Sequence, residues 1–476
     1  MRLVTIRQNL QRYVQWPRYF DRRRVNRKAS SVVFFAAVVV SAMASPRTEA
    51  AGTSCGGSEV NCVTEWNRIA EDTVIRSRAF QNEGLIYMAY VSAAMYDAAV
   101  AIDGRYKPYG AGVGAVPGAS AEAAVIEAAY QTLLNYFPTQ AALLEPLHAA
   151  SLATIPDDPS KLAGQSVGLS AANLIINTRT ADGLVVPIRA TCADFGGDPG
   201  TPCPKKEPGP GVWRLTPPYD PPQTPWVRNV RPFVFDSPDR FLPDEPPSLQ
   251  SSEWTEAFNE VKGQGLITST SRTPDQTAIA LFWTANVIRQ YNRALRDVVT
   301  VKGLDLIDSA RLQAMVNIVG ADAQIAVMNA KYHFLFWRPV TAIDPTSVTV
   351  DGFGPVPGFY DGNPATAEEP GWRPLVATPN HPEYPAAHGS ITSAMAEVFS
   401  TFLGTNRFDL VLHGFNPATG SMDVVRTFRT PAELRNEIID ARVWAGLHYR
   451  FSGNAGVALG RKVAKYDLRV AFGPAD

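Results

Sequence analysis

The stretch Lys331-Tyr-His-Phe-Leu-Phe-Trp-Arg-Pro339 closes a long apolar-periodic segment that begins near Asp308. The pattern predicts a helix over residues 308–337 that stops at the proline, which cannot continue the helical hydrogen-bond ladder. Lys331 and Arg338 are seven residues apart, and at about 3.6 residues per turn both cations would project from one helix face. Most residues between them are aromatic or apolar. Two poorly solvated positive charges predict an anion-binding face.

Composition limits the classes of partner. The chain has 476 residues, 45% of them hydrophobic, enough for two or three domains or one large helical body. Its formal net charge is -1, which argues against nucleic acid or an anionic membrane as the main partner, because neither would find a basic surface. Anion binding is therefore expected to be local.

The N-terminus has the layout of an export signal. A basic segment at residues 22–28 precedes an apolar run from Ser31 to about Met43, with Ala42 and Ala44 forming an A-x-A-like site. We therefore predict an export signal over residues 1–44 and an exported protein, periplasmic or secreted. The apolar run is short for a bilayer span, so no stable membrane insertion is expected after signal removal.

The four cysteines fall into two local groups. Cys55 and Cys62 are close in sequence, and Cys192 and Cys203 bracket a loop rich in glycine and proline. Two local disulfides are the simplest interpretation in an oxidising compartment. Zinc is the alternative, but the sequence offers no Cys-x-x-Cys and no nearby histidine pair to complete a ligand set.

Helical periodicity recurs along both halves, and no region is rich in strand patterns, so the predicted fold is all-α, with two packed helical bundles. In the first half we expect helices at about residues 64–102, 121–137 and 161–180. In the second half, Thr273-Pro274-Asp275-Gln276 forms a capping box that opens a helix extending to Val287. Further helices are expected after His388 to about residue 403, and at about 431–446 and 454–472.

Residues 187–247 form the natural boundary between the halves because they are dense in proline and rich in glycine. Trp213, Trp226 and Phe233 indicate a loop held against the body, where it either wraps the surface or lines a substrate entrance. The predicted organisation is an N-terminal helical region with this loop at 45–250 and a helical domain with the active site at 251–476. The N-terminal helices could form a homodimer contact or a second bundle packed on the catalytic one.

Two further groups of residues could lie beside Lys331 and Arg338 in the same anion site. One is the turn from Pro385 to His388, where a helix begins and its free backbone N–H groups can bind an anion. The other is Arg442 with His448, on a helix predicted to end near Gly446. Three cations, a helix N-terminus and two histidines suit a tetrahedral or trigonal-bipyramidal oxyanion such as phosphate or vanadate.

The three motifs resemble a known signature. Lys-x6-Arg-Pro at 331–339, Pro-Ala-Ala-His at 385–388 and Ala-Arg-x5-His at 441–448 resemble, in order and separation, the motifs shared by vanadium-dependent haloperoxidases and the type 2 phosphatidic acid phosphatase superfamily. Trp337, the lead-in at 381–385 and the segment at 93–98 are similar to the soluble bacterial haloperoxidase branch. The resemblance covers most of the chain from about Trp66.

The resemblance implies a role for each motif residue. Vanadate would be the cofactor, held by Lys331, Arg338 and Arg442 with the amide of Ala387, and ligated through vanadium by His448. His388 would be the acid–base group. The implied reaction is oxidation of a halide by hydrogen peroxide to a hypohalous acid equivalent, which would react with a small organic acceptor.

Two other functions use the same residues. Phosphate could occupy the site of an exported acid phosphatase, in which His448 forms a phosphohistidine and His388 protonates the leaving group. The third hypothesis is that the protein is an inactive homologue that only binds an oxyanion.

Two positions depart from the resembled pattern. Ala386 stands where the family usually has serine, which removes a hydroxyl donor, and Ser452 stands where the family has a carboxylate. The remaining histidines are expected to be structural or surface groups; they are His148, His333, His381 and His413.

Overall fold

The computed structural model describes residues 61–184, 209–216, 222–346, 349–350, 354–355 and 360–475. The chain divides into Met1–Thr48, which lies outside these ranges, and Glu49–Asp476, to which all following statements refer. The predicted export signal and three cysteines, Cys55, Cys192 and Cys203, lie outside the described residues. Cys62 is buried at the start of the first helix. The disulfides and the domain boundary at residue 250 remain predictions.

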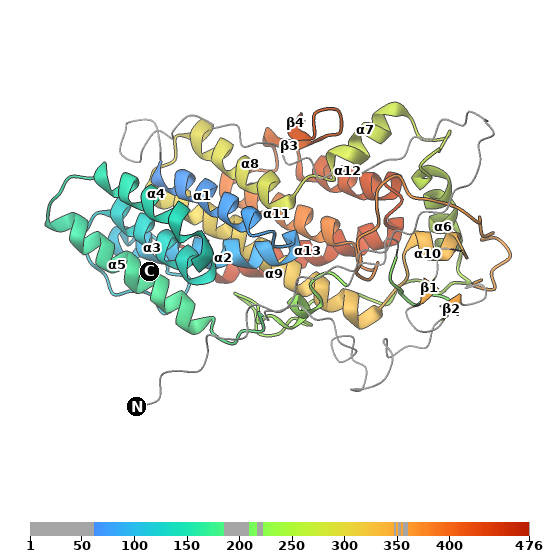
Figure 1. The fold of residues 1–476 in the computed structure, drawn as a ribbon, viewed down its shortest axis with the longest axis horizontal. Coiled ribbons are helices and arrows are strands. Elements are labelled where there is room, and N and C mark those ends of the chain that lie inside the picture. The colour runs from blue at the N-terminus through green and yellow to red at the C-terminus, as the bar shows by residue number, and fades with distance from the viewer. Residues whose placement is uncertain are drawn as a thin grey trace, which may run out of the picture. The chain divides into compact units, whose positions relative to one another are not determined.

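The described residues are mainly helical, which confirms the predicted all-α fold (Figure 1). The first half contains α1 (Cys62–Arg76), α2 (Gln81–Asp103), α3 (Ala121–Tyr136), α4 (Ala141–Ala153) and α5 (Pro159–Thr178), with the short turns η1 (Pro138–Gln140) and η3 (Pro225–Asn229). The second half contains α6 (Ser252–Gly265), α7 (Pro274–Phe282), α8 (Val287–Lys302), α9 (Leu306–Phe334), α10 (Pro339–Ile343), α11 (Ala387–Leu403), α12 (Pro431–Trp444) and α13 (Arg450–Val470).

Two buried helices form the centre of the fold. Helix α9 packs against α2 from the first half of the chain and against α11 and α13 from the second half. Helix α2 also packs against α3 and α5, which pack closely on each other. By length and composition α2 could cross a membrane, but 94% of its most apolar window is buried inside the protein, as expected for a core helix.

Close packing of α13 on α11 fixes the start of α11, where the Pro-Ala-Ala-His motif lies. Gly456 and Gly460 face the carbonyls of Ala386 and Ser390, and a Cβ at either glycine would overlap those oxygens. The amide of Ala386 donates to the carbonyl of Ser452 at 3.0 Å. The sequence therefore places the N-terminus of α11 by backbone contact, without a side-chain cap.

Several predicted boundaries were wrong. The helix expected at 64–102 is divided between α1 and α2, because Arg78 is left-handed with φ 62° and the carboxylate of Glu83 accepts from the amide of Phe80 to start a new helix. The helix that opens with the confirmed Thr273 capping box ends at Phe282. Asn286 then caps α8 by accepting from the amide of Ile288.

Short strands also occur, which the sequence pattern did not predict. The hairpin formed by β3 (Leu410–Asn416) and β4 (Ser421–Phe428) is antiparallel and packs against α7 and α8. A smaller antiparallel pair joins β1 (Thr349–Val350) and β2 (Gly354–Pro355). Neither pair changes the helical class of the fold.

Candidate functional site

Lys331 and Arg338 do not share one helix, which corrects the sequence prediction. Helix α9 ends at Phe334, and Leu335 is left-handed with φ 52°. The next residues pair with the Pro-rich loop: the amide of Trp213 donates to the carbonyl of Leu335 at 2.8 Å, and the amide of Trp337 donates to Gly211 at 3.2 Å. These backbone hydrogen bonds hold the segment extended, so Arg338 becomes the N-cap of α10.

Lys331 still reaches the predicted site from the last turns of α9. Its side chain is 0% exposed, and Nζ donates to the carbonyls of Pro382 and Glu383, each at 2.8 Å. Burial lowers the pKa of Lys331 well below its usual value, and the charge of Arg338 adds to this effect. An anion beside Nζ would relieve both costs.

Arg338 is buried and contacts several segments of the chain. Its Nε donates to the carbonyl of His381 at 3.0 Å, and Nη1 donates to the carbonyl of Leu447 at 2.9 Å. The same Nη1 lies 3.1 Å from Nε2 of His448, and Nη2 lies 3.0 Å from Nδ1 of His381. Burial lowers the pKa of Arg338 to about 10, against the opposing charge of Glu383. The guanidinium thus connects the first motif to the third motif and to His381 in the lead-in segment.

Arg442 and His388 approach from α12 and α11. Arg442 is buried, and Nη1 donates to the carbonyl of Trp283 at 3.3 Å, while its buried Nε has no hydrogen-bond partner among the described residues. Burial, followed by the charge of Arg338, lowers the pKa of Arg442 to about 9. His388 lies in the first turn of α11 and is partly exposed. Desolvation lowers its pKa well below the usual value, and Arg442 and Lys331 add to this effect, which favours the neutral imidazole.

His448 leaves the surface of α12, as the sequence predicted. Helix α12 ends at Trp444, and Gly446 has a φ of 76°, a conformation that favours glycine. The turn is closed by the amides of Leu447 and His448, which donate to the carbonyl of Arg442 at 3.2 and 3.3 Å. His448 is 2% exposed, and its ring is carried back toward Arg338.

Glu383 is a site residue that the sequence interpretation missed. It is 0% exposed, and its Oε1 lies 2.7 Å from Nδ1 of His448 and accepts from the amide of Tyr449 at 3.1 Å. Burial raises the pKa of Glu383 to about 7, while Arg338 and Lys331 oppose this shift. The signal was present in the sequence, because Glu383 lies in the lead-in at residues 381–385.

The site residues meet at a cavity of about 590 Å³. Ala387, His388, Arg442 and His448 line it, so the structure brings four of the six predicted site residues to one surface, with Lys331 and Arg338 buried behind it. The described residues lining the cavity include no aspartate or glutamate. The rest of the lining consists of apolar, amide and hydroxyl side chains and His381; it includes Phe80, Gln81, Asn82, Gln223, Thr284, Asn286, Thr378 and Ile391.

His381 also lines this cavity, which corrects the expectation that it is a structural or surface group without company. No spacing rule linked His381 to Arg338, because the two residues are 43 positions apart in the chain and meet only in the fold. Burial lowers the pKa of His381 well below its usual value, and the charges of Lys331 and Arg338 add to this. The imidazole of His381 therefore joins those of His388 and His448 at the cavity.

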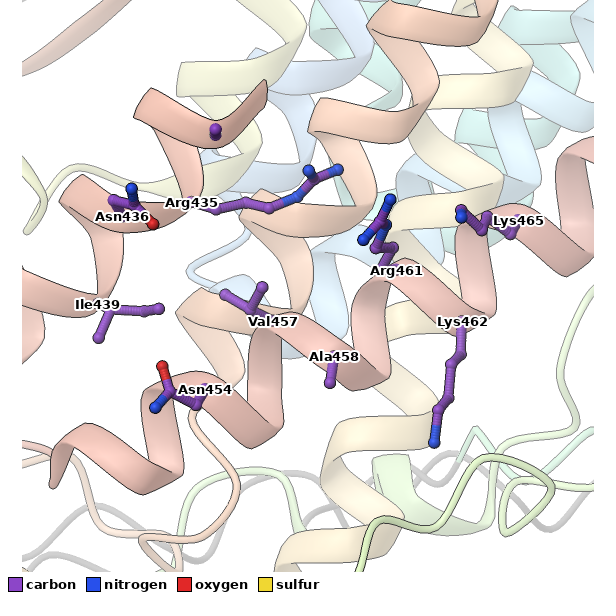
Figure 2. A pocket seen from close by; sticks show the side chains of 10 residues that line it. Arg435, Asn436, Ile439, Asn454, Val457, Ala458, Arg461, Lys462 and Lys465 are labelled. Atoms are coloured by element: carbon purple, nitrogen blue, oxygen red, sulfur yellow. The ribbon is translucent and has the colours of Figure 1, made fainter. Parts of the chain in front are cut away.

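A second cavity of about 530 Å³ lies between α12 and α13 and contains none of the predicted site residues (Figure 2). Its basic side chains are partly neutralised, because Glu397 accepts from Arg435 at 2.5 Å and from Arg461 at 2.9 Å. Figure 2 shows Lys462 directed away from Arg435 and Arg461. The cavity therefore lacks the converging cations of the first site.

The donor set at the first cavity suits an oxyanion. Three buried cations face one buried carboxylate, so the group carries excess positive charge when all four are ionised. Within the described residues, no cluster of three or more histidine, cysteine, aspartate or glutamate side chains could hold a metal ion by itself. The imidazole of His448 places one ring nitrogen next to these cations, 3.1 Å from Arg338.

Comparisons with known proteins identify relatives of this chain. Residues 311–473 match the family described as the VCPO second helical-bundle domain. A vanadium chloroperoxidase from Curvularia inaequalis is 27% identical over 282 residues, which cover 46% of this chain and 44% of that protein. The chain thus spans less than half the length of this curated relative.

Solved structures show the same fold. A bacterial vanadium-dependent iodoperoxidase superposes with a TM-score of 0.68 at 20% identity, over 88% of this chain and 99% of that one. A bacterial vanadium-dependent chloroperoxidase in its holo form superposes with a TM-score of 0.59 at 16% identity, over 83% and 91% of the two chains. These matches confirm the resemblance and the helical-bundle fold that the sequence predicted.

Proposed function

Because the chain resembles vanadium-dependent haloperoxidases in its second helical bundle and in its fold, we propose that it is a haloperoxidase that oxidises halide with hydrogen peroxide. The observation that carries the proposal is a cavity lined by Arg442, His388 and His448, with Arg338 3.1 Å from the His448 ring nitrogen and Lys331 buried behind it. Its products would be a hypohalous acid equivalent and the halogenated form of a small organic acceptor.

The residues present fit vanadate as the cofactor. Three buried cations have only one carboxylate among them, and the buried Nε of Arg442 has no partner in the described structure. Lys331, Arg338 and Arg442 would hold the oxyanion, the amide of Ala387 would assist at the start of α11, and His448 would provide the ligand nitrogen. In the structure Arg338 donates toward this nitrogen, so vanadate would replace that contact.

His388 would move the proton. Bound vanadate would supply the Lewis acid that activates peroxide toward halide. Lost solvation and nearby cations lower the pKa of His388, which favours its neutral imidazole, and the residue lines the cavity. It can therefore accept a proton from hydrogen peroxide that enters there. The uncharged remainder of the lining imposes no repulsion on an entering halide.

The proposal is tested by reconstitution. Protein freed of oxyanions is mixed with vanadate and hydrogen peroxide, and oxidation of iodide, bromide and chloride is followed separately. We expect halide oxidation that requires both vanadate and peroxide and disappears in His448→Ala. No vanadate-dependent oxidation of any halide would refute the proposal. Phosphate release from phosphomonoesters, measured in parallel without peroxide, distinguishes a phosphatase.

Export of the protein is a separate proposal. It is supported by the basic and then apolar order of residues 22–43. The test is to express the full chain in a bacterial host that exports proteins and to determine the N-terminal sequence of the exported protein. Cleavage near Ala44 would support the proposal. An intact N-terminus on cytosolic protein would contradict it.

A further inference from the structure

We propose that Glu383 is the positioning residue of His448: its carboxylate holds the imidazole so that Nε2 is directed at the oxyanion. This deepens the proposed function and rests on it for the identity of the oxyanion. The role is one that the resembled family pattern would place at position 452, where this chain has serine. In this chain Glu383 would thus supply the carboxylate from a different segment.

The contacts of Glu383 fix the ring from one side. Oε1 lies 2.7 Å from Nδ1 of His448 and accepts from the amide of Tyr449 at 3.1 Å. Both partners belong to the turn after α12, while Glu383 belongs to the segment before α11. One carboxylate oxygen therefore binds both the His448 ring and the backbone of the next residue, and it links them to the segment that precedes the Pro-Ala-Ala-His motif. Lys331 secures the same segment through the carbonyls of Pro382 and Glu383.

The opposite side of the ring identifies the tautomer. An arginine has N–H donors only, so the Arg338 nitrogen 3.1 Å away requires a lone pair on Nε2 of His448. A neutral ring then carries its proton on Nδ1, where Glu383 is placed to accept it. This is the tautomer that a ligating Nε2 needs, and a carboxylate on the other ring nitrogen is the usual means of fixing it.

The neighbourhood of Ser452 explains its departure from the family pattern. Ser452 is 0% exposed, and its hydroxyl donates to the backbone carbonyl of Glu383 at 3.4 Å. A carboxylate at 452 would lie close to Glu383, whose own carboxylate is already buried. Two buried like charges repel. A chain that uses Glu383 therefore favours a small neutral residue at 452.

The experiment compares Glu383→Gln and Glu383→Asp with the wild-type chain. Titration calorimetry measures vanadate and phosphate binding, and nitrogen-15 NMR of histidine side chains in the oxyanion-free protein measures the Nδ1 proton of His448. We expect the vanadate Kd of Glu383→Gln to rise roughly 10- to 100-fold, with an upfield shift and faster exchange of the Nδ1 proton. Glu383→Asp should recover part of both.

Glu127→Gln is the matched control. Glu127 and His148 form another carboxylate–histidine pair, with Oε2 and Nε2 2.8 Å apart, away from the oxyanion cavity. This variant should change only the resonances of His148. Unchanged affinity and an unchanged His448 proton in Glu383→Gln would overturn the proposal. If the wild-type chain binds neither anion, the proposed function fails, whereas the NMR comparison still decides the role of Glu383.

Discussion

Restoring a hydroxyl at position 386 should strengthen both α11 and the oxyanion site. Ala386 is the N-cap of α11 and provides no side-chain hydrogen bond, whereas Ser120 caps α3 by accepting from the amide of Ala123 at 3.2 Å. In Ala386→Ser the oxygen can accept from the amide of Gly389, three residues on. Its proton remains available to the oxyanion, because a hydroxyl has one donor and two acceptor sites.

The two effects have separate magnitudes. Serine in place of alanine at an N-cap contributes about 1 kcal/mol to the free energy of unfolding. A hydrogen bond to a charged group contributes about 1.5 to 3 kcal/mol, which lowers the vanadate Kd by roughly 10- to 150-fold. Ala386 is fully buried, so the added oxygen must fit without moving α13. We therefore expect tighter vanadate binding together with a more stable oxyanion-free protein.

Calorimetry of vanadate binding and urea unfolding of the oxyanion-free protein separate the two effects. Ser120→Ala is the control, because it removes a cap of the same kind from α3 and should cost about 1 kcal/mol of stability with no change in vanadate Kd. Greater stability with an unchanged Kd would show that the hydroxyl does not face the anion. Weaker binding would refute the predicted placement of Ala386 at the site.

Three further predictions concern proton and charge. Asp322 and Asp467 are both buried. Burial raises the pKa of Asp322 to about 7, and burial together with the charge of Asp322 raises the pKa of Asp467 well above its usual value. Since these folded pKa values exceed unfolded values of about 4, the free energy of unfolding should fall as pH rises through 4 to 7. Asp467→Asn should lessen that fall between pH 5 and 8, measured by urea unfolding, and an equal fall would contradict the raised pKa of Asp467. His388→Ala should still bind vanadate but lose about 10²- to 10⁴-fold in halide oxidation; full activity would exclude it as the base. Ser452→Asp should lower the melting temperature because of repulsion with Glu383, and Ser452→Asn should not; equal melting would count against that repulsion.

The sequence predicted the helical class and the residues that converge, because both depend on local patterns. Hydrophobic periodicity marks buried helix faces, and the three motifs carry fixed spacings. Lys331 and His448 lie where the motifs indicated. The local route to them was predicted less well: Leu335 leaves the helix because the next residues pair with the loop at 211–213, a long-range contact that spacing along one segment does not encode.

Glu383 and His381 were missed for the same reason. Each acts through a residue far away in sequence, 65 positions for Glu383 with His448 and 43 for His381 with Arg338. Their own neighbourhood, rich in proline, gives no periodic signal. The hairpin of β3 and β4 was also missed, because its outer strand is largely exposed and shows little contrast between faces.

The most direct test of the central claim is a calorimetric titration of oxyanion-free protein with vanadate, with His448→Ala and Glu127→Gln beside the wild-type chain. The account predicts saturable binding by the wild-type chain and by Glu127→Gln. It predicts that binding by His448→Ala is at least about 10-fold weaker, since a ligand nitrogen is lost. Absence of binding by the wild-type chain, or equal affinity in His448→Ala, would contradict the assignment of this cavity as the vanadate site.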